Sequence, residues 1–114
     1  MLSIEKLKDY GADVESGLER CMNSEEFYFR MINTLVEEDH FSTLEKAIND
    51  NNLDLAFDAA HALKGVVGNL SLTPLYKELV EITELLRSRT AMDYSEHLNK
   101  IEEQKSILKN LVSE

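Results

Sequence analysis

The chain has 114 residues, of which 43% are hydrophobic and 30% charged, and its formal net charge is −10. This composition excludes a disordered chain, and the length suits a single domain, residues 1–114, with one hydrophobic core. The acidic excess argues against nucleic acid and anionic membranes as partners, because phosphate binding requires clustered Lys and Arg.

Three helices are predicted in the first 36 residues, and each begins after a side chain that can cap backbone amides. The caps are Ser3, Asp13 and Ser24, and Gly11 ends the first helix. Apolar residues recur at helical spacing in all three helices. They are Ile4 and Leu7 in the first helix, Val14, Leu18 and Cys21 in the second, and Phe27, Tyr28, Met31, Ile32, Leu35 and Val36 in the third.

A break at residues 37–39 precedes a fourth helix, and the Asn-rich turn at 49–52 precedes a fifth. The fourth helix has apolar residues at helical spacing. These are Phe41, Leu44, Ala47 and Ile48. Asn52 is the expected N-cap of the fifth helix, which runs to about Leu70.

Thr73 and Pro74 mark the start of a sixth helix, with Thr73 as its cap and Pro74 at its first position. A loop at 90–93 leads to the last helix. One face of each helix is apolar and is expected in the core. The residues are Leu75, Leu79, Ile82 and Leu86 in the sixth helix, and Tyr94, Leu98, Ile101, Leu108, Leu111 and Val112 in the last.

No strand-like alternation of apolar and polar residues persists, and the single proline leaves long stretches without a helix breaker. The expected fold is all-α. We predict an antiparallel four-helix bundle with short additional N-terminal helices that cover one end or one side.

The cellular compartment is indicated by what the sequence lacks. Cys21 is alone, so no intrachain disulfide forms, which is typical of a reducing compartment. The charged N-terminal residues do not resemble a signal peptide, and no apolar run approaches the ~20 residues that span a bilayer. We therefore expect a cytoplasmic protein.

The fifth helix carries the most informative residues of the chain. At about 100° per residue, one arc is apolar and the opposite arc surrounds His61. The apolar arc, expected in the core, holds Leu55, Ala56, Ala59, Leu63, Val66, Val67 and Leu70; the arc around His61 holds Asp54, Phe57, Asp58, Lys64, Gly65 and Gly68. Each helical glycine costs about 1 kcal/mol relative to alanine, so two glycines beside a histidine indicate that the imidazole must be accessible.

Three interpretations of His61 compete: a surface histidine without a role, a metal ligand, and a nucleophile. A metal site would need His40 and His97 from other helices, because the fifth helix offers no second ligand at metal spacing. An imidazole nucleophile is favoured by its neutral fraction near pH 7 and by its reactivity toward phosphorus.

The neighbours of His61 favour the nucleophile. Lys64 lies one turn along the same face, where its ammonium can pair with phosphoryl oxygens. Gly65 and Gly68 leave a low backbone surface on which a second protein can approach the ring. Phe57 has two interpretations of equal weight: packing against the helix that contains Phe41, or membership of a docking patch.

Residues 60–65, Ala-His-Ala-Leu-Lys-Gly, and 68–70, Gly-Asn-Leu, resemble the signature of histidine-containing phosphotransfer (HPt) domains. The resemblance extends to Asn52-Leu53 and Thr73-Pro74, where family members turn into and out of the motif helix, and to the segment 18–24. It implies a four-helix bundle and a role in multistep two-component phosphorelays.

The resemblance implies that His61 accepts a phosphoryl group from a receiver-domain aspartate and passes it to another receiver. Lys64 would assist electrostatically, and the two glycines would give clearance. The expected partners are response-regulator receiver domains and a hybrid sensor histidine kinase. The docking patch is expected to comprise Phe57, Asp58, Ala60, Lys64, Gly65 and Gly68.

No Gly-rich phosphate loop or nucleotide-binding motif occurs in the chain. We therefore expect a phosphorelay intermediate without a kinase site, a cofactor or a metal site of its own. The resemblance to HPt domains implies a monomer and implies that the magnesium used in transfer lies on the receiver. The alternative is a non-catalytic helical adaptor that binds a receiver or another signalling protein through the same face. Both a free-standing protein and a part of a larger hybrid kinase fit the sequence.

Overall fold

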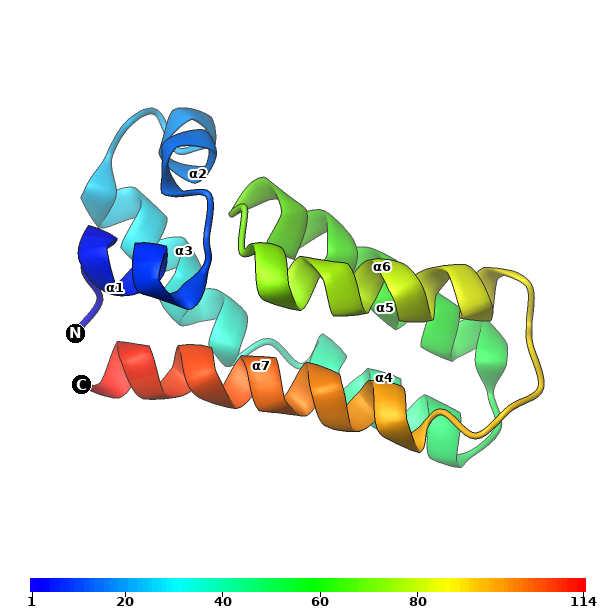
Figure 1. Cartoon of the computed structure of the whole chain (residues 1–114). Coiled ribbons are helices and arrows are strands. Elements are labelled where there is room, and N and C mark those ends of the chain that lie inside the picture. The colour runs from blue at the N-terminus through cyan, green and yellow to red at the C-terminus, as the bar shows by residue number, and fades with distance from the viewer.

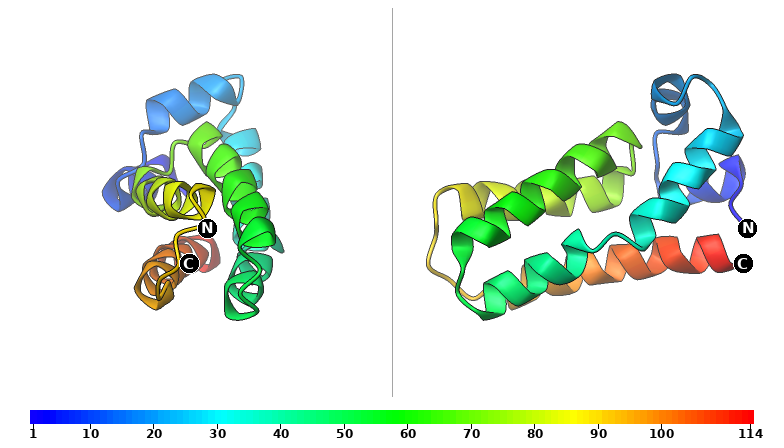
Figure 2. Two further views of the ribbon diagram at one scale, coloured as in Figure 1. Left: turned by 90° about the vertical axis from the view of Figure 1, so that its right-hand side faces the viewer. Right: turned by 180° about the vertical axis from the view of Figure 1, so that it is seen from behind.

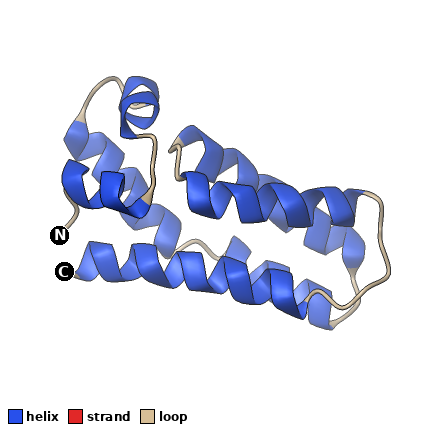
Figure 3. Ribbon diagram, viewed as in Figure 1, coloured by secondary structure: helices blue, strands red, loops and turns tan.

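The chain folds into a bundle of helices with two short helices at one end (Figure 1). The computed structural model describes residues 1–114. The helices are α1 (Ile4–Tyr10), α2 (Val14–Arg20), α3 (Glu25–Val36), α4 (His40–Asn49), α5 (Leu53–Asn69), α6 (Thr73–Arg87) and α7 (Ser95–Ser113). Only helices and loops are present (Figure 3), which confirms the all-α prediction.

The bundle has four antiparallel helical segments. Helices α3 and α4 follow one another and form the first segment, and α5, α6 and α7 form the other three. Helix α5 packs against both α4 and α6, while α7 packs against α6 and α3. Both chain termini lie at one end of the molecule beside α1 (Figure 2), where Lys6 Nζ lies 3.4 Å from a carboxylate oxygen of Glu114. The predicted four-helix bundle is confirmed.

The predicted caps explain where most helices begin. The side chains of Ser3, Asp13, Ser24 and Asn52 each accept a hydrogen bond from a backbone amide three residues ahead. Gly11 ends α1 with φ 110°, a left-handed conformation that suits glycine. The predicted break at 37–39 separates α3 from α4.

The start of α6 differs from the prediction by one residue. Leu72 is the N-cap, so Pro74 falls at the second helical position and Thr73 does not cap. The Thr73 hydroxyl instead donates to the Ser71 carbonyl at 3.4 Å. Leu72 is fully buried, and its packing fixes the register of α6 without a polar cap.

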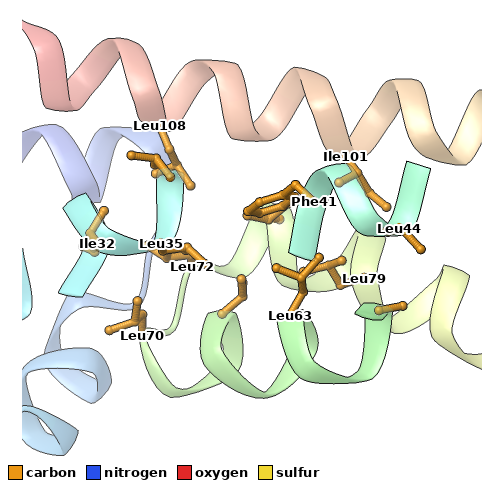
Figure 4. Packing of buried hydrophobic residues seen from close by; sticks show 14 of the residues in the cluster. Ile32, Leu35, Phe41, Leu44, Leu63, Leu70, Leu72, Leu79, Ile101 and Leu108 are labelled. Carbon is orange, nitrogen blue, oxygen red and sulfur yellow. The ribbon is translucent and has the colours of Figure 1, made fainter. Parts of the chain in front are cut away.

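One hydrophobic core runs through the molecule and includes residues from all seven helices. Side chains of α3, α4, α5, α6 and α7 interlock at its centre (Figure 4). The labelled residues there are Ile32, Leu35, Phe41, Leu44, Leu63, Leu70, Leu72, Leu79, Ile101 and Leu108. The N-terminal helices therefore share the core of the bundle.

Hydrogen bonds attach the N-terminal segment to the end of α5. The buried Tyr28 hydroxyl on α3 donates to the Leu70 carbonyl at 2.8 Å, and the Asp13 amide donates to the Ser71 carbonyl at 2.9 Å. The carbonyls after the last turn of a helix lack intrahelical partners. These contacts satisfy two such carbonyls, and so α3 and the N-cap of α2 fix the C-terminal end of the helix that carries His61.

Candidate functional site around His61

Helix α5 presents one narrow strip to solvent because α4 and α6 cover its other sides. His61 lies on this strip and is exposed, as are Asp58 and Gly65. The buried face is built from small and branched residues. It comprises Ala56, Ala59, Ala60, Leu63 and Val67.

The docking patch predicted from the sequence is wrong at one position, Ala60. Its side chain is fully buried, so it cannot contact a partner. Conversely, Leu55 and Val66 were expected in the core but are 44% and 39% exposed. The helical wheel set the core directly opposite His61, whereas the two flanking helices rotate the buried arc of α5 toward Ala60.

The imidazole of His61 has no polar partner within the chain. The other two histidines lie beside carboxylates: His40 Nδ1 is 2.7 Å from Glu38 Oε1, and His97 Nδ1 is 3.9 Å from Glu81 Oε1. The Phe57 ring stacks on the His61 ring with a centroid distance of 5.6 Å and an interplanar angle of 15°. Both ring nitrogens of His61 are therefore free of competing hydrogen bonds.

Lys64 lies one turn after His61, as predicted, and is half-buried. It forms no ion pair within the chain. Its side chain borders a polar cavity of about 460 Å³ between α2, the second half of α5 and the first turn of α6. The Lys64 ammonium thus keeps its charge available for an anion near His61.

The two glycines of the motif differ in their surroundings. A Cβ added at Gly65 would meet nothing within 4 Å, which is the open surface that the sequence predicted. A Cβ added at Gly68 would lie 2.9 Å from Cε1 of Tyr76 on α6. Gly68 is therefore half-buried against a helix neighbour, and the expectation of a freely exposed Gly68 is wrong.

Phe57 was interpreted either as packing against the helix of Phe41 or as part of a docking patch, and the structure adds contacts with the end of α6. The guanidinium carbons of Arg87 and Arg89 each lie 5.1 Å from the centroid of the Phe57 ring. Arg89 Nε also donates to Asp54 Oδ1 at 2.6 Å. The Phe57 ring is thus in contact with two cations from the end of α6.

Sequence reasoning missed three arginines close to the motif. Arg20 on α2 donates from Nη1 to the Gly68 carbonyl and to Ser71 Oγ, both at 2.8 Å. The other two are Arg87 and Arg89. In an antiparallel bundle the end of the sixth helix lies beside the start of the fifth. The predicted topology therefore already placed Arg87 and Arg89 near Phe57. No local pattern indicates Arg20, which lies 48 residues before Gly68.

The metal-site interpretation that combined His40, His61 and His97 is wrong. These residues lie on α4, α5 and α7, respectively. The structure brings no three His, Cys, Asp or Glu side chains together in an arrangement that could hold a metal ion. None of the seven helices combines the length and the apolar composition that crossing a membrane requires.

Comparison with protein families identifies the Hpt domain. Residues 34–114, more than half of the chain, match the family model of the Hpt domain. This range includes α4 to α7 and leaves α1, α2 and most of α3 outside. Neither curated proteins nor solved structures gave a significant match.

Proposed function

The chain belongs to the Hpt domain family, and from this premise we propose that it carries a phosphoryl group on His61 between receiver-domain aspartates. Hpt domains act in histidine phosphotransfer within phosphorelays, as phosphocarrier modules. The observation that carries the assignment to His61 is its exposure on the open strip of α5, with free ring nitrogens and an open backbone at Gly65.

The proposed reaction is an in-line displacement at phosphorus. The lone pair of one imidazole nitrogen forms a P–N bond while the P–O bond to the receiver aspartate breaks, and the carboxylate leaves with the electron pair. The other ring nitrogen keeps its proton, so the phosphoimidazole starts as a cation. Transfer to a second receiver reverses these steps.

Lys64 is proposed to stabilise the phosphoryl oxygens in both directions. A lysine without an ion pair can contact an anion without first losing another partner. Gly65 is proposed to let the receiver backbone approach, because no side chain stands beside the ring. The remaining catalytic groups would come from the partner.

We propose receiver domains and a hybrid sensor histidine kinase as partners and the cytoplasm as the compartment. The docking surface is proposed to include Phe57, Asp58, Lys64, Gly65 and Gly68. We also propose a monomeric single domain over residues 1–114. The core shared by all seven helices supports this, although residues 1–33 lie outside the family match.

The test is incubation of the chain with a receiver domain charged by ³²P-labelled acetyl phosphate. We expect acid-labile, base-stable label on the native chain and on His40→Gln, and none on His61→Gln, whose helical circular dichroism should be unchanged. Label that persists on His61→Gln would refute the assignment. A folded native chain that takes no label from any of several receivers would favour the adaptor function instead.

A further inference from the structure

The orientation of the His61 ring depends on one aromatic neighbour. Phe57 precedes His61 by four residues, the spacing at which side chains meet on a helix. Their rings are nearly parallel, with 15° between the planes and 5.6 Å between the centroids. Histidine rings at reactive sites are usually held by a hydrogen bond to one nitrogen, and His61 has none. The Phe57 ring therefore replaces that hydrogen bond as the contact that restricts the imidazole.

Phe57 is itself held from the side of α6. Arg87 ends α6, and Arg89 follows in the next turn with φ 51°, a left-handed conformation. Both guanidinium carbons lie 5.1 Å from the Phe57 ring centroid, within the range of cation–π attraction. The ring thus contacts both the arginines at the end of α6 and the imidazole.

Arg89 is fixed at both ends of its guanidinium group. Its Nη1 donates to the Leu86 carbonyl at 2.6 Å, and its Nε donates to Asp54 Oδ1 at 2.6 Å. Asp54 lies in the first turn of α5, one turn before Phe57. A continuous set of contacts therefore runs from Asp54 through Arg89 and Phe57 to the imidazole.

The ion pair between Asp54 and Arg89 contributes little to the folding stability of the protein. The Asp54 side chain is 85% exposed and that of Arg89 is 43% exposed. Exposed ion pairs contribute little to folding because solvent screens them and their side chains lose entropy. Besides the Arg89 hydrogen bond to the Leu86 carbonyl at the end of α6, the consequence of these contacts is the placement of the Phe57 ring.

We infer that Phe57, clamped by Arg87 and Arg89, is a positioning residue that orients the His61 imidazole for attack on phosphorus. The inference rests on the proposed phosphotransfer function. A reacting atom must lie close to its target in an aligned geometry, and an exposed ring that rotates freely spends less time aligned. The receiver reaches His61 from one direction, whereas a small donor can reach it from several.

The test compares Phe57→Leu, which removes the flat ring, with Phe57→Tyr, which keeps it. We expect Phe57→Leu to lower the maximal transfer rate from a receiver charged with labelled acetyl phosphate by about tenfold, in addition to any rise in the half-saturating receiver concentration from the lost docking contact. Phosphorylation by phosphoramidate, a small donor, should stay within about twofold. Phe57→Tyr should restore receiver transfer, and Phe29→Leu, the same change at another half-buried phenylalanine, should have no effect.

A spectroscopic measurement reports the stack directly. The carbon-bound imidazole protons of His61 should show ring-current shifts in the native chain and in Phe57→Tyr, and lose them in Phe57→Leu.

Arg89→Gln should slow receiver transfer in the native background but not in Phe57→Leu, because Arg89 acts through Phe57. Equal losses in both backgrounds would show that Arg89 contacts the receiver and would overturn the clamp.

Three results would overturn the positioning role: unchanged transfer in Phe57→Leu, an equal loss with phosphoramidate, or a rise in the half-saturating receiver concentration alone. The last would leave Phe57 with a docking role alone. Failure of the native chain to take label from either donor would instead overturn the proposed function.

Discussion

Lys64 lies one helical turn after His61, is half-buried and has no ion pair in the chain. Its charge is therefore the part of the motif most directly testable by a single substitution. We predict that Lys64→Ala slows transfer from a phosphorylated receiver about tenfold, equivalent to about 1.4 kcal/mol of activation free energy, or shortens the lifetime of the phosphohistidine.

The measurement is the initial rate of label transfer together with the rate of phosphohistidine hydrolysis. Lys77→Ala is the control, because Lys77 is an exposed lysine on another bundle helix, α6, and like Lys64 forms no ion pair in the chain. If Lys64→Ala matched this control in both quantities, Lys64 would have no part in the site.

Substitutions at Gly65 can distinguish an effect on receiver access to His61 from an effect on folding stability. Because a Cβ there meets no atom within 4 Å, Gly65→Ala should raise the free energy of unfolding by up to about 1 kcal/mol, the helix-propensity difference. Gly65→Gln should fold equally well but slow transfer more than tenfold by blocking the receiver. Thermal unfolding and transfer rates check both; normal transfer in Gly65→Gln would refute the need for clearance.

The residue scale also shows the limit of a helical wheel. The shared face of His61, Lys64 and Gly65 could be predicted from one short stretch, because helical spacing alone brings these positions together. Ala60 and Gly68 could not, because whether a small residue faces solvent or a neighbouring helix depends on where α6 packs. The same packing exposes Leu55, which sequence reasoning had assigned to the core.

At the scale of elements, the N-terminal helices hold the end of α5 through a close approach at Gly17. A Cβ added at Gly17 on α2 would lie 2.6 Å from the Tyr28 hydroxyl and 2.8 Å from the Leu70 carbonyl oxygen. Real Cβ atoms do not come so close to other atoms, so α2 would have to move.

We predict that Gly17→Ala lowers the free energy of unfolding by about 1–2 kcal/mol, since overpacking outweighs the gain in helix propensity. Gly65→Ala is the matched control: the same substitution in another helix, with the opposite sign. Chemical denaturation followed by circular dichroism measures both. A stabilised Gly17→Ala variant would show that α2 does not pack tightly on α5.

The elements themselves were largely predictable, because caps and apolar spacing are local. Ser3, Asp13, Ser24 and Asn52 all cap as expected. Thr73 fails as a cap because the buried Leu72 sets the start of α6, which is a tertiary effect. The attachment of α2 to α5 through Arg20 was not predictable, since its partners are backbone groups brought close only by folding.

At the scale of the whole molecule, buried tyrosines make stability depend on alkaline pH. Burial raises the pKa of Tyr28 to about 12 from its ordinary value of 10.0, with smaller contributions from Cys21 and Asp13. Burial also raises the pKa of Tyr10. The folded protein therefore keeps these protons above pH 10, where the unfolded chain loses them.

Titration of these tyrosines should consequently leave the free energy of unfolding independent of pH below about pH 10. Above that, the free energy of unfolding should fall as pH rises toward 12, by up to about 1.4 kcal/mol per pH unit for each tyrosine. Denaturant unfolding at pH 8, 10 and 11 measures this slope. Tyr28→Phe should start less stable, because the Leu70 carbonyl loses its donor, but should show a shallower slope. An identical slope in that variant would contradict the assignment to Tyr28.

The most direct test of the central claim follows one phosphoryl group through the protein. A receiver domain charged with ³²P-labelled acetyl phosphate is mixed with the native chain, and a second, uncharged receiver is then added. We predict that label leaves the first receiver, collects on His61 as acid-labile phosphate and then moves to the second receiver, with no passage through His61→Gln. Label that reaches the second receiver equally well through His61→Gln, or never leaves the first, would contradict the account.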